Sequence, residues 1–241
     1  MTDTQALENA LRAINDARNI ALVPSQKAGA DSFSAAVGMY FALEEFQKEV
    51  HFVFPHDIPQ PATDLIEDYK IITDVREKEL LVSIDYTKTK AGHAHYLADD
   101  GELHIKLGPI HDNFSAEDHI KTRLVGYEFD AIVVLGAQSL EDLGETFEHL
   151  SDVFETAHTI NVDNSKENSG HGKTNLISHE SPSLSKQALD LVTKWELPLG
   201  ERAARAFLTG MTYKNGENDP KLTIEEVLNL PLLRLENPQN S

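Results

Sequence analysis

The stretch NIALVPSQKAGADSFSAAVGMYFALEEFQKEVHFVF, residues 19–54, decides the fold class. Residues 19–24 are a short continuous apolar run, which is typical of a strand buried on both faces. A polar loop follows, then apolar residues at helical spacing, and then a second apolar strand at residues 50–54. Two strands joined through a helix in this way predict a parallel pair with a right-handed crossover.

The same alternation continues along the chain. A helix is expected at residues 7–17, further strands at 127–135 and 158–162, and a helix between them at 140–154. We therefore predict an α/β fold with a doubly wound, mostly parallel, Rossmann-like sheet. Ligands of such sheets bind beyond the carboxyl ends of the strands. Those ends lead into three loops, residues 25–32, 136–139 and 163–172.

The pattern changes between about residues 78 and 122. Short strands are expected at 80–86, 93–98 and 102–107, with Asp99-Asp100-Gly101 as hairpin-turn residues. We interpret this as an antiparallel β insertion in a single domain. The domain spans residues 1–235, has helices in its C-terminal third at 184–195, 200–211 and 224–230, and is followed by a polar tail, 236–241. The edges of the insertion can pair with a second copy or with a partner, so a homodimer is one interpretation.

The amino-acid composition limits the classes of partner that the protein is expected to bind. Forty acids against twenty-one Lys and Arg give a formal charge of −19, which disfavours direct nucleic-acid binding. There is no cysteine, and neither an N-terminal signal pattern nor a long apolar stretch is recognisable. We expect a cytoplasmic protein without a membrane segment, whose partner is an unknown protein or a small anionic ligand.

The three loops carry an ordered set of motifs. The first loop reads Ser25-Gln-Lys-Ala-Gly29-Ala-Asp31, and the second begins at Gly136 after an apolar strand. The third reads Val162-Asp163-Asn164-Ser165-Lys-Glu-Asn168-Ser-Gly170, and a later helix ends in Leu208-Thr-Gly210-Met. In this order they resemble the motifs of the DHH phosphoesterase family, which includes RecJ-like nucleases and nanoRNase–pAp phosphatases.

The resemblance implies a cleft that holds two divalent ions, commonly manganese, through Asp and His ligands. In this chain only Asp31 and Asp163 are retained as ligand types. Other residues stand where the family has ligands: Ser25, Gly29, Gly136, Asn164, Ser165 and Lys214. The ancestral cleft would be formed by Asp31, Gly136, Asp163, Asn164, Ser165, Asn168 and Gly170.

We therefore predict a degenerate, non-catalytic member of this family with no catalytic residue and no cofactor. Asp31 and Asp163 would hold at most one weakly bound Mg²⁺ or Mn²⁺. The usual second domain of the family has almost no room after residue 235. The alternative is a divergent phosphoesterase that acts on short oligonucleotides or nucleoside phosphates. It would hold one Mn²⁺ or Mg²⁺ through Asp31, Asp163 and a further residue such as Asp85 or His171.

Structural roles compete with these ligand roles. Asp31 precedes a helix and can cap it, Asp163 can orient the loop that follows it, and Asn168 can hold a turn. The sequence Gly170-His-Gly-Lys-Thr174 resembles the end of a phosphate-binding loop, but Glu167 stands where the first glycine is required and a strand follows. We interpret that match as coincidental, although Lys173 remains a candidate contact for an anion.

Histidines and serines supply two weaker hypotheses. His93 and His95 share one face of a predicted strand, and in this hypothesis His104 or His111 completes a zinc-like site. Such hairpin histidines are usually surface residues. Ser25 and Ser165 occupy family ligand positions, but a serine nucleophile also needs a base, and His171 is the base nearest to them in the sequence.

Overall fold

The computed structural model describes residues 4–65, 71–76, 79–87, 92–110, 114–214, 217–218, 223–225 and 227–229. The chain divides into two compact units. The sheet unit comprises Met1–Arg76 and Tyr127–Ser241, and the inserted unit comprises Glu77–Gly126.

The sheet unit is built on six parallel strands in the order β10-β9-β8-β1-β2-β3. These strands are β1 (Asn19–Pro24), β2 (Glu49–Val53), β3 (Ile71–Ile72), β8 (Ala131–Leu135), β9 (His158–Asp163) and β10 (Thr174–Ile177). Numbered along the chain, this is the order of a doubly wound dinucleotide-binding sheet. The predicted α/β fold class is therefore confirmed.

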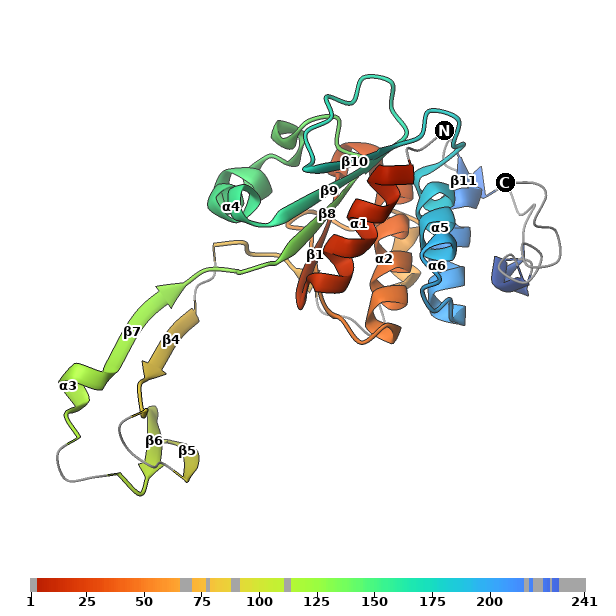
Figure 1. Cartoon of the computed structure of the whole chain (residues 1–241). Helices are drawn as coiled ribbons and strands as arrows, with labels where there is room; N and C mark the ends of the chain where they lie inside the picture. Colours follow the sequence, from red (N-terminus) through yellow and green to blue (C-terminus); the bar gives the residue numbers. More distant parts are fainter. Residues whose placement is uncertain are drawn as a thin grey trace. The chain divides into compact units, whose positions relative to one another are not determined.

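Helices cover both faces of the sheet (Figure 1). One face carries α1 (Thr4–Asp16), α2 (Gly29–Glu45), α5 (Leu184–Lys194) and α6 (Glu201–Thr212). The other face carries α4 (Glu145–Thr156) and the short 3-10 helix η3 (Leu140–Leu143). Successive strand residues enter opposite layers: Leu22 packs with α2 and Val23 with the α4 layer. This double coverage explains why the central strands β1 and β8 are almost continuously apolar.

Several predicted boundaries differ from the structure. The helix expected at 140–154 is divided, because Gly144 has a left-handed backbone (φ 55°) between η3 and α4. Further 3-10 turns cover Gln26–Ala28 and Ala62–Leu65, and a small ribbon pairs β11 (Tyr213–Lys214) with β12 (Glu217–Asn218). Of the helix expected at 224–230, residues 224–225 and 227–229 are helical, whereas residue 230 and the tail 236–241 lie outside the described residues.

The inserted unit consists of two antiparallel ribbons. β4 (Glu79–Ile84) pairs with β7 (Ile120–Val125), and β5 (His93–Asp99) pairs with β6 (Glu102–Gly108). A short helix, α3 (Ala116–His119), precedes β7. The hairpin turn contains Asp100 and Gly101, both at positive φ, as the Asp-Gly pair predicts. The unit reaches Gly126 because β7, which was not predicted, pairs with the whole of β4.

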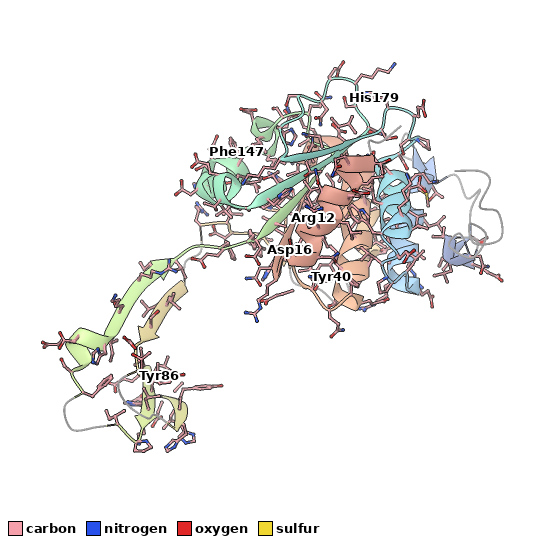
Figure 2. The ribbon with its side chains drawn as sticks, viewed as in Figure 1. Arg12, Asp16, Tyr40, Tyr86, Phe147 and His179 are labelled. Carbon is pink, nitrogen blue, oxygen red and sulfur yellow. The ribbon has the colours of Figure 1, made fainter. Side chains whose placement is uncertain are left out.

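Side chains of the inserted unit project outward from its ribbons, as around Tyr86 in Figure 2. None of its described side chains is buried. Among the helices that the structure describes, none is long and apolar enough to cross a membrane.

Candidate ligand-binding site

Three strand ends form a row at the carboxyl edge of the sheet. The Ser25 backbone N–H donates to the Leu135 carbonyl (2.9 Å), and the Gly136 N–H donates to the Val162 carbonyl (2.9 Å). Ser25 and Gly136 directly follow β1 and β8, and Asp163 is the last residue of β9, so the three lie at the same level of the sheet. β1 leads into α2 on one face and β8 leads toward α4 on the other, so the topological switch point lies between them.

Asp31 holds the start of a distant helix. Its two carboxylate oxygens accept the backbone N–H groups of Leu184 (2.7 Å) and Ser185 (2.9 Å), in the first turn of α5. The Ser185 hydroxyl also donates to the Asp31 carbonyl (3.0 Å). Burial raises the pKa of Asp31, and the bonds from Ser185 and Leu184 oppose that shift. Asp31 thus caps a helix, but the helix is α5 rather than its own α2.

Gly136 is closely covered by that same helix end. Its backbone is left-handed (φ 73°), and a Cβ placed there would lie 2.5 Å from Leu184 Cδ1 and 2.8 Å from Ala28 Cβ. The space at this motif position is therefore filled by apolar side chains. At Gly29, by contrast, a Cβ would meet no atom within 4 Å.

Asp163 orients the loop that follows it. One carboxylate oxygen accepts the backbone N–H groups of Asn164 (2.8 Å) and Ser165 (3.1 Å), and the other accepts Asn168 Nδ2 (2.6 Å). Asp163 is only 3% exposed. All of these partners are donors from the same loop, so the carboxylate has the loop-orienting role that we considered for it.

A network of three asparagines holds the rest of this loop. Asn161 Nδ2 donates to the side-chain oxygens of Asn168 (2.8 Å) and Asn175 (2.9 Å). Asn168 Oδ1 also accepts the Gly170 N–H (2.8 Å), and its Nδ2 reaches the Ala137 carbonyl (2.9 Å). Sequence reasoning included Asn168 but missed Asn161, although an amide inside an otherwise apolar strand is a usable signal.

Lysines of this region have fixed partners. Lys173 Nζ donates to three backbone carbonyls at the end of α4, those of Glu155 (3.0 Å), Thr156 (3.1 Å) and Ala157 (2.6 Å). This helix-terminal role contrasts with the anion contact that we considered for Lys173. Lys27 forms an ion pair with Asp142, and its hydrogen bond lowers the pKa of that carboxyl.

The Lys27–Asp142 pair crosses the switch point. Lys27 lies after β1 and Asp142 lies in η3 after β8. Asp142 also accepts the Gln138 N–H (3.2 Å), which ties it to the β8 loop. Lys27 is a cation at this edge of the sheet that remains 70% exposed. Sequence reasoning missed this pair because its partners are far apart in the chain.

Ser25, Ser165 and His171 do not form a nucleophile–base pair. Ser25 is 1% exposed, and its hydroxyl has no hydrogen-bond partner among the described residues. The Ser165 hydroxyl accepts Gln138 Nε2 (3.1 Å) and the Glu167 N–H (3.2 Å). Both His171 ring nitrogens are buried without a hydrogen bond of standard geometry in the part that the structure describes. Burial lowers the pKa of His171.

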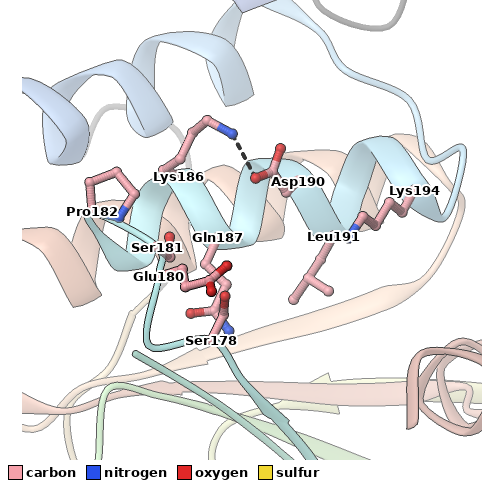
Figure 3. Close-up of a pocket in the computed structure, with 9 residues that line it drawn as sticks. All are labelled: Ser178, Glu180, Ser181, Pro182, Lys186, Gln187, Asp190, Leu191 and Lys194. Atoms are coloured by element: carbon pink, nitrogen blue, oxygen red, sulfur yellow. Dashed lines mark hydrogen bonds and ion pairs between the residues drawn. The ribbon is translucent and has the colours of Figure 1, made fainter. Parts of the chain in front are cut away.

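Two pockets flank this edge, and sequence reasoning identified neither. An open pocket of about 470 Å³ lies beyond β1, β2 and β3. Its lining residues are Gln26, Pro55, His56, Asp57 and Thr73. A second pocket, of about 290 Å³, lies between the end of β10 and α5, where Lys186 is paired with Asp190 (2.6 Å) (Figure 3).

Other residues considered from the sequence lie elsewhere. Asp85 belongs to the inserted unit, where it accepts the Thr87 N–H (3.0 Å) and hydroxyl (2.7 Å). The ring centroids of His93 and His95 lie 5.1 Å apart, while His104 Nε2 lies 3.4 Å from a Glu102 carboxylate oxygen. His111 and the Lys214 side chain fall outside the described residues. Within the described ranges, no three His, Asp or Glu residues converge as metal ligands.

Gly210, in the last of the four motifs, has a packing role. A Cβ at Gly210 would collide with Ser185 and come within 3.0 Å of Ser34 Cβ. This glycine therefore lets α6 approach α5 and α2 closely.

Comparison with known proteins shows that the chain has a fold similar to that of a solved structure. No protein-family model matches the chain, and no curated protein sequence matches it. Among solved structures, it is similar to an exopolyphosphatase-related protein from Bacteroides fragilis, with 15% identity and a TM-score of 0.57. The match covers 95% of this chain and 57% of that chain, so this protein spans little more than half of its neighbour's length. The chain thus shares the α/β fold of an exopolyphosphatase-related protein.

Proposed function

We propose that this protein is a DHH-like phosphoesterase-fold domain that binds a small anionic ligand and does not hydrolyse it. One observation carries the proposal: Asp31 binds the first turn of α5, and that turn places Leu184 over Gly136. The resemblance puts one retained ligand at Asp31 and one lost ligand at Gly136. A helix end and a leucine side chain now occupy both places.

Asp163 supports the same conclusion. Each of its carboxylate oxygens already accepts N–H donors of the following loop. A two-metal site needs several anionic ligands that converge on the same space, with the ions roughly 4 Å apart. Asp31 and Asp163 instead accept hydrogen bonds from N–H groups of the protein, which favours a structural role for both acids.

The carboxyl edge still offers features suited to a ligand. Lys27 projects at the switch point with most of its side chain exposed, and the adjacent Gln26 lines the open pocket beyond β1. Asp142 is the partner of Lys27, and an anionic group could take its place. We therefore assign Lys27 as the main anion contact and Asp142 as its competitor.

A hydrolysis assay tests the catalytic half of the proposal. The full chain would be incubated with Mn²⁺ and small phosphodiesters, phosphomonoesters and inorganic polyphosphate. We expect no turnover above a buffer blank. Turnover that Asp163→Asn abolishes would support instead the alternative of a divergent phosphoesterase.

A binding measurement tests the other half. Pyrophosphate and AMP would be titrated into the full chain by calorimetry, with Lys27→Ala, Asp142→Asn and Lys121→Ala as variants. We expect Lys27→Ala to weaken binding at least about tenfold and Asp142→Asn to strengthen it, because the competitor is neutralised. Lys121, which belongs to β7 of the inserted unit, is the control that removes the same charge and should change nothing. Equal losses for Lys27→Ala and Lys121→Ala would refute the assigned contact.

A further inference from the structure

The inserted unit has apolar faces without a core to cover them. Its β5–β6 hairpin alternates in period two, so opposite faces differ in character. One face carries only uncharged, mostly apolar side chains: Ala94, Tyr96, Ala98, Leu103, Ile105 and Leu107. On that face Tyr96 is 82% exposed and Leu103 is 63% exposed. The opposite face carries His93, His95, Leu97, Asp99, Glu102, His104 and Lys106.

The β4–β7 ribbon repeats this arrangement. In its register, Leu80 lies opposite Leu124 and Ile84 opposite Ile120, with Val82 and Thr122 between them. This face is also uncharged, and its Leu80, Leu124 and Ile120 are exposed. A two-stranded ribbon is only marginally stable by itself, so two such ribbons with bare apolar faces indicate a surface that normally has a cover.

The exposed area is close to what a stable contact needs. Six large side chains on the two faces are exposed: Leu80, Tyr96, Leu103, Ile105, Ile120 and Leu124. At roughly 100 Å² each they present on the order of 600 Å², against about 800 Å² per partner in a standard interface.

Charge favours a second copy of the chain as the cover. Residues 77–126 contain nine acids and six Lys or Arg, so they contribute −3 of the total of −19. The sheet unit contributes the remaining −16, and copies meeting there would repel each other more. A two-fold contact also places like faces together, which suits faces that are apolar and uncharged. The excess of acids over bases argues against an anionic lipid surface.

We propose that the inserted unit is a homodimer interface, in which the apolar faces of its two ribbons pack against a second copy of the chain. The proposed contact involves only residues of the inserted unit. The proposal does not rest on the proposed ligand site.

The chain supplies a matched pair of variants for the test. Leu103 and Leu97 lie on the same hairpin with nearly equal exposure, 63% and 60%, but on opposite faces. Light scattering of the full chain at about 50 µM should give twice the monomer mass of 26.8 kDa. Leu103→Lys should give the monomer mass, and Leu97→Lys should leave the dimer intact. A monomeric wild type, or two variants that behave alike, would overturn the proposal.

Cross-linking checks the same interface without placing a charge in it. Because the chain contains no cysteine, Leu103→Cys and Leu97→Cys would each introduce a single thiol. With a short bis-maleimide, Leu103→Cys should give a cross-linked dimer in several-fold higher yield than Leu97→Cys. Equal yields, or a higher yield from Leu97→Cys, would contradict the assigned face.

Discussion

The sheet unit and the inserted unit use apolar residues in opposite ways. Every buried residue of the described chain lies in the sheet unit, where helices cover both faces of the strands. Ten of the eleven exposed large hydrophobic side chains among the described residues lie in the inserted unit. The central sheet strands β1 and β8 are almost continuous apolar runs, whereas β5 and β6 of the inserted unit alternate. The hydrophobic pattern of a strand thus indicates how many of its faces are covered within the chain.

Polar residues differ between the units as well. In the sheet unit, Asp31 and Asp163 are bound by backbone and amide donors, so they contribute to the architecture. In the inserted unit, His93 and His95 are exposed on the outside of a hairpin. The two carboxylates of the sheet unit thus contribute to the fold of the larger unit.

The largest expected effect contrasts one aromatic residue from each unit. Phe33 is fully buried and packs edge-on against Phe52 and Phe54, with ring centroids 5.0 and 5.1 Å away. Phe33→Ala should lower the free energy of unfolding by about 3–5 kcal/mol, while Tyr96→Ala should change that of the sheet unit by less than about 0.5 kcal/mol.

Urea unfolding followed by tryptophan fluorescence measures this contrast. Trp195, the one tryptophan of the sequence, is buried at the end of α5 and therefore reports on the sheet unit. Similar losses from Phe33→Ala and Tyr96→Ala would show that the two units share one core.

A smaller effect is expected from two glycines of the sheet unit. Both Gly136 and Gly144 have positive φ, but only Gly136 has neighbours where a Cβ would lie. Gly144→Ala should cost about 1–2 kcal/mol for its backbone alone, and Gly136→Ala about 2–4 kcal/mol because it must also displace Leu184. The same unfolding experiment measures both.

Adding Leu184→Ala checks the cause. It should recover part of the loss in the Gly136→Ala background, because it removes the atom that a new Cβ would meet. Strictly additive losses would mean that Leu184 does not fill this space.

The smallest effect concerns Asp130, which accepts the backbone N–H groups of Arg18 (2.8 Å) and Asn19 (2.9 Å). Asp130→Ala should cost about 1 kcal/mol at pH 7. Bonds from Asn19 and Arg18 lower the pKa of Asp130, so its contribution is present above its usual pKa of 3.8 and is lost as the pH falls through the lowered value. The wild type and the variant should therefore converge in acid, and a constant difference would contradict this.

The sequence was informative about the fold where apolar runs are long. Residues 19–24 and 158–162 read as strands, and the loops that follow them lie at the carboxyl edge of the sheet as expected. β7 was missed because the polar run Lys121-Thr-Arg123 separates its apolar residues, which need β4 as a partner. Gly144 divides a helix that its apolar spacing predicts as continuous.

The candidate site could be predicted only in part. Hydrogen-bond partners that are close in the sequence could be predicted, as for Asp163 and the loop that it orients. The partner of Asp31 did not, because Leu184 is 153 residues away in the chain. The Lys27–Asp142 pair likewise joins loops that only the order of the sheet brings together.

The central proposal is that Asp31 and Asp163 stabilise the fold and hold no metal ion. The most direct measurement is the urea midpoint of the full chain with and without 1 mM Mn²⁺, beside Asp163→Asn. We predict that Mn²⁺ leaves the midpoint, and hence the free energy of unfolding, unchanged. A site with a Kd of about 10 µM would instead raise the free energy of unfolding by about 2.7 kcal/mol. An increase of that size in the wild type that is absent in Asp163→Asn would contradict the account.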